Sequence, residues 1–239
     1  MNEKLKGHLH PITQTIREIY SVFHELGFAI ADGPELEDDF HCFTALNFPK
    51  DHPARDMQDT FWIKPQPGQS KGLDMVLRTH TSTVQIRYME EHKDSLPIRI
   101  IVPGKVYRNE ATDATHEAQF YQIEALYVDK NVTIAHLKGV LENMFKRLFG
   151  DDVEIRFRPS FFPFTEPSLE VDMKLKGKWL EMGGSGLVHP NVLRAVGIDP
   201  TVWQGFAFGF GVDRIAMLKF GYDDIRHSYT GDLRFVNQF

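Results

Sequence analysis

Two long stretches of the chain carry apolar residues at helical spacing. In residues 12–26 they recur at steps of three and four, with Pro11 suited to a first turn and Gly27 to a C-terminal stop. Residues 134–148 repeat the pattern and end before Gly150. Each stretch therefore predicts an amphipathic helix with one face on a core. Shorter helices are predicted at residues 37–46, at 82–92, capped by Thr81 or Ser82, and at 212–220, closed by Gly221.

Other stretches have the composition and alternation of strands. Residues 98–110 and 118–129 are two such segments, and the polar loop between them is too short for a helical crossover. We therefore expect them to pair antiparallel. Short links of this kind favour an α+β fold, an antiparallel sheet flanked by helices, over a doubly wound parallel sheet. An insert at residues 64–72 is predicted to be a hairpin tip. Further strands are predicted at residues 28–32, 59–64, 74–79, 153–162, 169–175, 178–184 and 206–211.

Length and composition limit the class of protein. The 239 residues, 42% apolar and 25% charged, predict one globular domain over residues 1–239. No window approaches the roughly 20 apolar residues that cross a bilayer, and the N-terminus lacks a secretory signal, so we expect a cytoplasmic protein with no membrane partner. The formal charge of −6 means that any nucleic acid is held by a local basic patch or a partner chain. The single cysteine, Cys42, is expected to be a buried structural thiol.

One predicted strand face carries an unusual set of side chains. Phe120, Gln122 and Glu124 alternate onto one face of residues 118–129. Arg108 and Glu110 share a face of the preceding strand. Because a solvent-facing strand gives the same alternation, this pattern alone leaves a surface and a binding site about equally open.

Two further features favour a binding site. The loop "ATDATHEA", residues 111–118, places His116 beside acidic and hydroxyl residues, which suits a flap over a polyphosphate. The stretch "GFAFGFGVDR", residues 205–214, alternates small residues with phenylalanine and then enters a helix. It has neither the lysine of a P-loop nor the third glycine of the dinucleotide fingerprint. Its glycines let the backbone approach a flat ligand, and Arg214 adds a donor fork at the anion-attracting end of a helix.

These residues carry a resemblance to a known family. "VYRNE" followed by "FYQIE" resembles motif 2 of class II aminoacyl-tRNA synthetases, and "GFGVDR" leading into a helix resembles their motif 3. The helix, strand and Gly33-Pro34 near the start resemble motif 1, which implies a dimerisation region within residues 1–48. Taken in order, "HPARD", "DTFW", "LRTHTS", "DATHEA", "FFPFTEP", "KWLEMGGSG" and "VHPNVL" are similar to the α subunit of bacterial phenylalanyl-tRNA synthetases.

The resemblance implies a catalytic core that activates L-phenylalanine with ATP, releases pyrophosphate, and transfers the acyl group from phenylalanyl-adenylate to tRNA(Phe). It implies two catalytic residues, Arg108 at the α-phosphate of ATP and Arg214 at the γ-phosphate. The other implied ATP-binding residues are Glu110 and Phe120 at adenine, His116 at the triphosphate, and Gly211 in the floor. Glu166 in "FTEP" matches a ligand of Mg²⁺ that the family shares with its β subunit. The alternative for Glu166 is a carboxylate that caps the turn before Pro167.

For the amino acid, the resemblance implies that Phe162 and Phe164 contact the substrate ring above a floor formed by Ala207. Each ring contact contributes about 0.5–1.5 kcal/mol beyond area burial. From the residues alone, both phenylalanines are predicted to be core residues instead. The other implied phenylalanine-binding residues are Trp62, His80, Ser82, Gln122, Glu124 and Gly209.

The resemblance also implies partners. The family's α subunit joins a β subunit in an (αβ)₂ heterotetramer, and an α homodimer is expected for the chain alone. The family's N-terminal coiled-coil arm, which engages tRNA, has no counterpart here, so we expect inefficient tRNA charging. Two other functions stay open. One is a non-catalytic paralogue that binds an amino acid or a partner; the other is related chemistry on another acid, against which the aromatic-sized pocket of "FFPF" with Ala207 argues.

Overall fold

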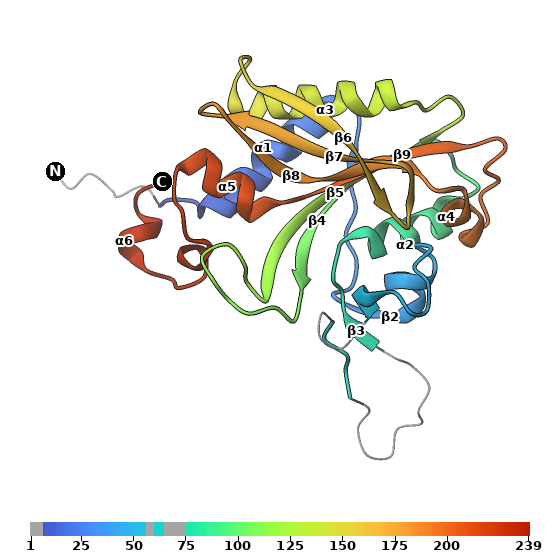
Figure 1. Ribbon diagram of the computed structural model, residues 1–239, viewed down its shortest axis with the longest axis horizontal. Helices are drawn as coiled ribbons and strands as arrows, with labels where there is room; N and C mark the ends of the chain where they lie inside the picture. Colours follow the sequence, from blue (N-terminus) through green and yellow to red (C-terminus); the bar gives the residue numbers. More distant parts are fainter. Residues whose placement is uncertain (1–6, 56–59, 65–74) are drawn as a thin grey trace.

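The fold is built on a seven-stranded sheet with helices packed on its two faces (Figure 1). The computed structural model describes residues 7–55, 60–64 and 75–239. The predicted hairpin tip at residues 64–72 therefore lies, apart from Lys64, outside the described residues. The strand order is β1-β4-β5-β9-β8-β7-β6. This arrangement confirms the predicted α+β fold with an antiparallel sheet flanked by helices.

All but one of the neighbouring pairs in this sheet are antiparallel. The exception is β1, a two-residue edge strand within the strand predicted at residues 28–32. Its parallel pairing, in which Ala29 lies opposite Ile100 of β4, was not predicted. Residues 31–97 connect the two strands, and a connection this long can return the chain in the same direction. The strands are β1 (Ala29–Ile30), β4 (Ile98–Tyr107), β5 (Gln119–Asp129), β6 (Glu154–Phe162), β7 (Thr165–Leu175), β8 (Lys178–Val188) and β9 (Gln204–Gly211).

A small second sheet replaces part of the helix predicted at residues 37–46. That prediction holds in part, because Phe40–Thr44 are helical, as a π-helix. It is wrong for residues 37–38, because Glu37 does not face solvent as the first turn of an amphipathic helix would require. Glu37 is fully buried and accepts a hydrogen bond from Arg87 Nε at 2.9 Å, a residue 50 positions away. Cys42 is fully buried, as predicted. The elements here are β2 (Leu36–Asp38), the π-helix η1 (Phe40–Thr44), the 3₁₀-helix η2 (Pro53–Arg55) and β3 (Met75–Leu77).

The longer predicted helices form where the apolar spacing placed them. The long helix α3 ends before Gly150, whose φ of 99° no residue with a side chain adopts easily. The predicted cap of α2 is absent: Thr81 makes no capping bond, and Ser82 donates across to Glu124 of the sheet instead. Predicted helices are α1 (Pro11–Glu25), α2 (Ser82–His92), α3 (Ile134–Phe149) and α5 (Val212–Phe220); α4 (Pro190–Ala195), η3 (Ile225–Ser228) and α6 (Leu233–Val236) were not predicted. Within the described ranges, no helix combines the length and hydropathy of a membrane span.

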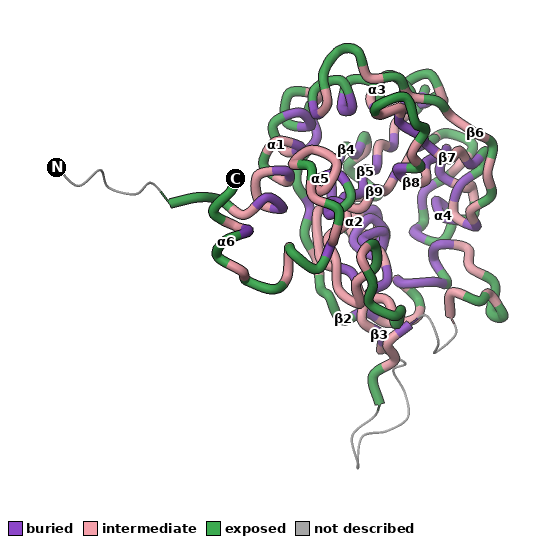
Figure 2. The backbone as a smooth tube through the Cα atoms, turned by 60° about the vertical axis from the view of Figure 1, so that its left-hand side comes forward, coloured by how far each residue is buried: buried purple, intermediate pink, exposed green. Residues whose placement is uncertain are grey.

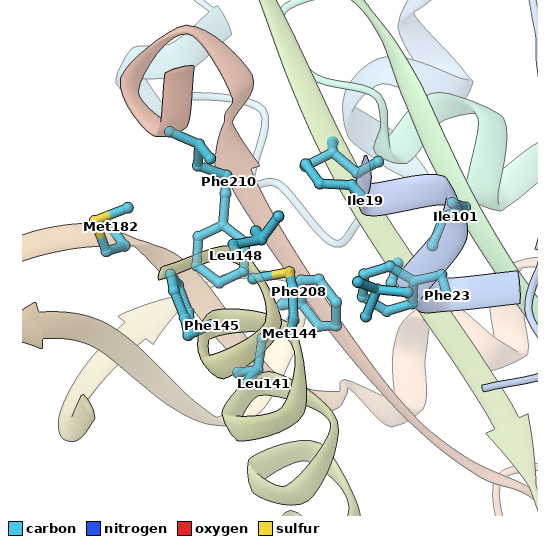
Figure 3. Packing of buried hydrophobic residues seen from close by; sticks show 14 of the residues in the cluster. Ile19, Phe23, Ile101, Leu141, Met144, Phe145, Leu148, Met182, Phe208 and Phe210 are labelled. Carbon is cyan, nitrogen blue, oxygen red and sulfur yellow. The ribbon is translucent and has the colours of Figure 1, made fainter. Parts of the chain in front are cut away.

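Apolar residues pack on both faces of the sheet. On one face, α1, α3 and α5 build the larger core; Figure 3 shows Phe145 of α3 and Phe23 of α1 near Phe208 and Phe210 of β9. On the other face, α2 and α4 cover a second cluster. In Figure 2 the buried backbone accordingly runs through the sheet and the packed sides of the helices. The part of the second face that these helices leave uncovered forms the floor of a cavity.

Candidate active site

A cavity of about 920 Å³ lies over β5, β8 and β9, bordered by the β4–β5 loop and the first turn of α5. Most of the predicted site residues line it, although they come from segments far apart in the sequence. From the predicted ATP-binding set these are Arg108, Glu110, His116, Phe120, Gly211 and Arg214, and from the predicted phenylalanine-binding set His80, Ser82, Gln122, Glu124, Phe162, Phe164, Ala207 and Gly209.

The register of β5 and β9 sets the order of groups along the floor. Leu126 lies opposite Ala207, Glu124 opposite Gly209, and Gln122 opposite Gly211. Phe120 comes two residues further toward the β4–β5 loop. At about 3.3 Å per residue, the floor from Leu126 to Phe120 spans about 20 Å. A Cβ at Gly209 would lie only 3.0 Å from Glu124 Cγ, so the absence of a side chain at Gly209 leaves space for the Glu124 side chain. The cavity is thus elongated, with chemically different ends.

Glu124 is a buried carboxyl group that accepts hydrogen bonds from α2 and from Thr81, the residue before this helix. Its Oε2 accepts from Ser82 Oγ at 2.6 Å and from Gln85 Nε2 at 3.0 Å. Its Oε1 accepts from the Thr81 N–H at 3.2 Å. Removal from water raises the pKa of Glu124 to about 7, although these hydrogen bonds oppose the shift. A cationic group in the cavity would favour its ionised form.

Two other polar side chains of the cavity wall lack partners. Both ring nitrogens of His80 and Oε1 of Gln122 are shielded from solvent, with no hydrogen bond of normal geometry in the described part of the chain, although a backbone group of Cys42 interacts weakly with the His80 ring. Burial lowers the pKa of His80 to about 3, and the charge of Arg108 adds to the effect, so the ring is neutral. Because native proteins rarely leave buried polar atoms unsatisfied, these atoms indicate a polar ligand in the cavity.

Aromatic rings enclose the end of the cavity near Ala207. Phe162 and Phe164, at the turn between β6 and β7, are stacked with ring centroids 5.8 Å apart and 11° between their planes. Gly184 of β8 makes room for Phe162, since a Cβ at this position would lie 2.8 Å from the Phe162 ring. Phe48 packs against Phe164 with centroids 5.7 Å apart. This end of the cavity therefore offers ring contacts to an apolar ligand group.

Two arginines border the other end. Arg108 and Glu110 were predicted to lie within a strand at residues 98–110. The strand β4 ends at Tyr107, so both residues follow it instead. Arg108 Cζ lies 5.0 Å from the centroid of the Phe120 ring. Arg214 is exposed in the first turn of α5, as predicted, and no ion pair is found for it among the described residues. This end of the cavity therefore suits an anionic group.

His116 lies at the rim of the cavity in an ordered turn of the β4–β5 loop. Its Nδ1 is 3.0 Å from both carboxylate oxygens of the exposed Asp113. Hydrogen bonds from the Thr115 backbone and from His116 hold the pKa of Asp113 far below its usual range. The loop is tied to the C-terminal segment, because the Ile225 N–H donates to the Ala114 carbonyl at 2.9 Å.

Two predicted site residues do not line the cavity. Trp62 stacks near Phe43 with centroids 6.2 Å apart, and its indole N–H donates to the Arg55 carbonyl at 3.2 Å. The Glu166 carboxylate is 72% exposed and lies 3.3 Å from His189 Nε2. A contact of Trp62 with the amino acid and of Glu166 with Mg²⁺ therefore stay predictions.

Among the cavity-lining residues that were not predicted, three have contacts that shape the site: Phe48, Gly184 and Gln85. Phe48 and Gly184 have no signal of their own in the sequence, because their roles depend on segments that meet only in the fold. Gln85 had a signal: it comes three residues after Ser82, so both point from the same face of a helix. A buried amide on an apolar helix face indicates a polar partner across the interface.

The fold and the cavity define a class II aminoacyl-tRNA synthetase core. The family model described as "tRNA synthetases class II core domain (F)" matches residues 1–239. Pyrrolysyl-tRNA synthetase from Desulfitobacterium hafniense has the same fold, with a TM-score of 0.72 at 18% identity over 93% of this chain and 74% of its own. The phenylalanine–tRNA ligase α subunit of Bacillus pumilus (strain SAFR-032) is 53% identical over 98% of this chain and 69% of its own length. That of Colwellia psychrerythraea is 56% identical over 98% of this chain and 67% of its own. The chain therefore belongs to the class II tRNA synthetases and, within them, to the phenylalanine–tRNA ligase α subunits.

Proposed function

We propose that this chain activates L-phenylalanine with ATP to form phenylalanyl-adenylate and pyrophosphate, and passes the phenylalanyl group to tRNA(Phe). The observation that carries the proposal is one elongated cavity with stacked phenylalanines at one end, arginines at the other and a buried carboxyl group between them. Membership in the phenylalanine–tRNA ligase α-subunit family supports the choice of substrates.

The amino acid would bind with its ring beside Phe162 and Phe164 and above Ala207. Glu124 would then pair with its ammonium group, and this opposite charge would lower the pKa of Glu124 from its raised value. His80 and Gln122 would supply the missing hydrogen bonds around the polar groups of the substrate. Ser82 and Gly209 would act indirectly, Ser82 by holding Glu124 and Gly209 by leaving it room.

At the other end, the nucleotide would stack its adenine on Phe120, with Glu110 at the base edge. Arg108 would contact the α-phosphate, Arg214 the γ-phosphate and His116 the outer phosphates, above the floor at Gly211. An oxygen of the phenylalanine carboxylate would attack the α-phosphorus in line. The bond between the α-phosphorus and the pyrophosphate oxygen breaks as the new P–O bond forms, and no proton is transferred. The rate therefore depends on positioning and on neutralised phosphate charge.

Class II synthetases in general use Mg²⁺ with ATP, and the proposal extends this to the present chain. Mg²⁺ prefers carboxylate and phosphate oxygens, and when bound it neutralises phosphate charge. Among the residues predicted from the sequence, Glu166 is the one assigned to the metal. Its exposed carboxylate, away from the cavity wall, fits an ion shared with another chain better than an ion inside the cavity.

The proposal includes a β subunit, in an (αβ)₂ heterotetramer, because the relatives are named α subunits. It also includes tRNA(Phe) as the acyl acceptor. With a formal charge of −6, the chain needs a partner or a local basic patch to hold tRNA. An α homodimer of the chain alone and a cytoplasmic location stay predictions.

The experiment that tests the activity is phenylalanine-dependent exchange of labelled pyrophosphate into ATP, with the chain alone and with its β subunit. We expect Arg108→Ala to lower the exchange rate by about 100-fold or more, because a positioned cation at the reacting phosphate is lost. Phenylalanine binding, measured by calorimetry, should change little. Arg99→Ala is the matched control: this arginine also lies at β4, but it contacts Tyr127 and does not line the cavity.

Each outcome separates the two candidate functions. Exchange that Arg108→Ala abolishes and Arg99→Ala preserves supports the enzyme. Phenylalanine binding without exchange, even with the β subunit present, would instead identify a non-catalytic amino-acid-binding protein.

A further inference from the structure

Hydrogen bonds from within and from outside the hairpin hold the tip of the β6–β7 hairpin, where Phe162, Pro163 and Phe164 follow one another. The Phe162 N–H donates to Ser168 Oγ at 3.0 Å within the hairpin. The Phe164 carbonyl accepts from the His189 N–H at 2.9 Å. Pro163 has no N–H, so its carbonyl is its one backbone hydrogen-bonding group. That carbonyl accepts a hydrogen bond from Asn47 Nδ2 at 2.7 Å, across 116 positions of sequence.

Asn47 is itself fixed at both its backbone and its side chain. Its φ of 63° lies in the left-handed region, which asparagine tolerates better than most residues with a side chain. Its Oδ1 accepts from Asn191 Nδ2 at 3.0 Å, and Asn191 Oδ1 accepts from Arg194 Nη1 at 2.7 Å. This hydrogen-bonded chain leads from α4 through Asn47 to Pro163. Both polar atoms of the Asn47 amide are used, so its orientation is determined.

The residue after Asn47 contacts the other walls of the same end of the cavity. Phe48 packs on Phe164 with centroids 5.7 Å apart and stacks on His80 with centroids 6.2 Å apart and 2° between the planes. Asn47 and Phe48 therefore join the hairpin tip, through Pro163 and Phe164, to the His80 wall. The distances between the rings of Phe48, Phe164 and His80 therefore depend on the position of Asn47 and Phe48.

We infer that Asn47 is a positioning residue for the amino-acid end of the cavity: by holding the Pro163 carbonyl, it sets the spacing of the Phe162, Phe164 and Phe48 rings and so the size of aromatic side chain accepted. The inference rests on the proposed function, because it assumes that phenylalanine binds there. Without the Asn47 amide, the hairpin tip keeps its apolar contacts and the hydrogen bond from the His189 N–H at Phe164, but it loses the hydrogen bond at Pro163, between the two rings. The rings can then move apart, which weakens binding of phenylalanine and relaxes discrimination between ring sizes.

Two variants of Asn47 separate its side chain from its backbone conformation. Asn47→Gly keeps the left-handed φ available and removes the amide. Asn47→Asp keeps an oxygen for Asn191 but offers no N–H to Pro163. With the chain and its β subunit, we expect both variants to weaken phenylalanine binding and raise its KM by about tenfold, while the KM for ATP changes by less than about twofold. The preference in kcat/KM for phenylalanine over 4-chlorophenylalanine should decrease.

A purely structural role would lower the active fraction without changing that preference or separating the two KM values. Lys176→Gly is the matched control, since Lys176 is the other non-glycine residue with a positive φ among those described, 49°, and it lies at the β7–β8 turn. It should leave both KM values unchanged. Unchanged phenylalanine affinity and preference in both Asn47 variants would overturn the inference and leave the proposed function intact. Failure of the unmodified protein to bind phenylalanine would overturn the proposed function itself.

Discussion

At the scale of single residues, Glu124 links the burial of the cavity to a measurable pH dependence. Burial raises its pKa to about 7, so the carboxyl group of the free protein is mostly protonated at pH 6 and mostly ionised at pH 8. Because the substrate ammonium needs the ionised form, we expect the phenylalanine affinity to fall by about tenfold from pH 8 to pH 6. Calorimetry across this range tests the expectation. His80, with its pKa lowered to about 3, does not titrate there.

The raised pKa of Glu124 also determines whether the free energy of unfolding rises or falls with pH. The ordinary pKa of glutamate is 4.5, so between about pH 4.5 and 7 the folded chain binds more protons at Glu124 than the unfolded chain does. Its contribution to the free energy of unfolding therefore decreases as the pH rises through this window. Glu124→Gln should weaken phenylalanine binding at pH 8 and remove most of its pH dependence. A pH dependence that survives in this variant would assign the effect to another group.

The sequence could predict which residues share one face of a strand or helix, but not which distant residues they form hydrogen bonds with. The period-two alternation put Phe120, Gln122 and Glu124 together, and all three line the cavity. The same reasoning assigned Ser82 as a possible helix cap, whereas its hydroxyl bonds Glu124, 42 positions away. Such pairings depend on how α2 packs on the sheet, which no local pattern encodes.

At the scale of elements, the start of α5 is anchored by a C-terminal segment. Asp213 is buried and accepts hydrogen bonds from the Tyr121 N–H and the Tyr229 hydroxyl, each at 2.7 Å. Its neighbour Arg214 borders the cavity. We expect Tyr229→Phe to leave a buried carboxyl group short of one donor and lower the free energy of unfolding by about 1–3 kcal/mol. The KM for ATP should rise by about fivefold, because the first turn of α5 positions Arg214 less well, while the KM for phenylalanine stays unchanged.

Tyr127→Phe is the control for this change. The Tyr127 hydroxyl also donates to an aspartate, Asp129, at 2.8 Å, but neither residue lines the cavity. Pyrophosphate exchange at varied ATP should therefore show normal kinetics in Tyr127→Phe. Equal increases in both KM values in Tyr229→Phe would indicate general disorder of the site and not a role of α5.

The elements that sequence reasoning predicted well are those with long periodic patterns and sharp ends. α1 and α3 follow apolar spacing sustained over several turns, and glycines mark where they stop. The short elements follow tertiary contacts instead. In the segment predicted as one helix, an ion pair between the buried Glu37 and the partly exposed Arg87 holds a strand, and a π-helix follows at Phe40–Thr44. Four-residue elements such as α6 offer too few positions for any period to appear.

At the scale of the whole molecule, the sheet separates a core that gives stability from a cavity suited to chemistry. β9 shows how: its residues Phe206, Phe208 and Phe210 are buried in the core, whereas Ala207 and Gly209 alternate onto the cavity floor. The alternation therefore places phenylalanine rings in the core on one face of the sheet and small residues at the cavity floor on the other. Truncations on the core face should change stability without changing substrate affinity.

Phe145→Ala tests this separation. Phe145 of α3 is fully buried, and its ring lies 5.4 Å from that of Phe210 on the core face (Figure 3). Loss of its contacts and the cavity left behind should lower the free energy of unfolding by about 3–5 kcal/mol in denaturant titrations. The KM values for ATP and phenylalanine should stay within about twofold of normal where the variant is folded. Phe161→Ala removes a ring that is 81% exposed and should cost less than about 0.5 kcal/mol. If Phe145→Ala shifts either KM severalfold, the two faces are coupled, because the sheet then transmits the movement of core side chains to the cavity floor.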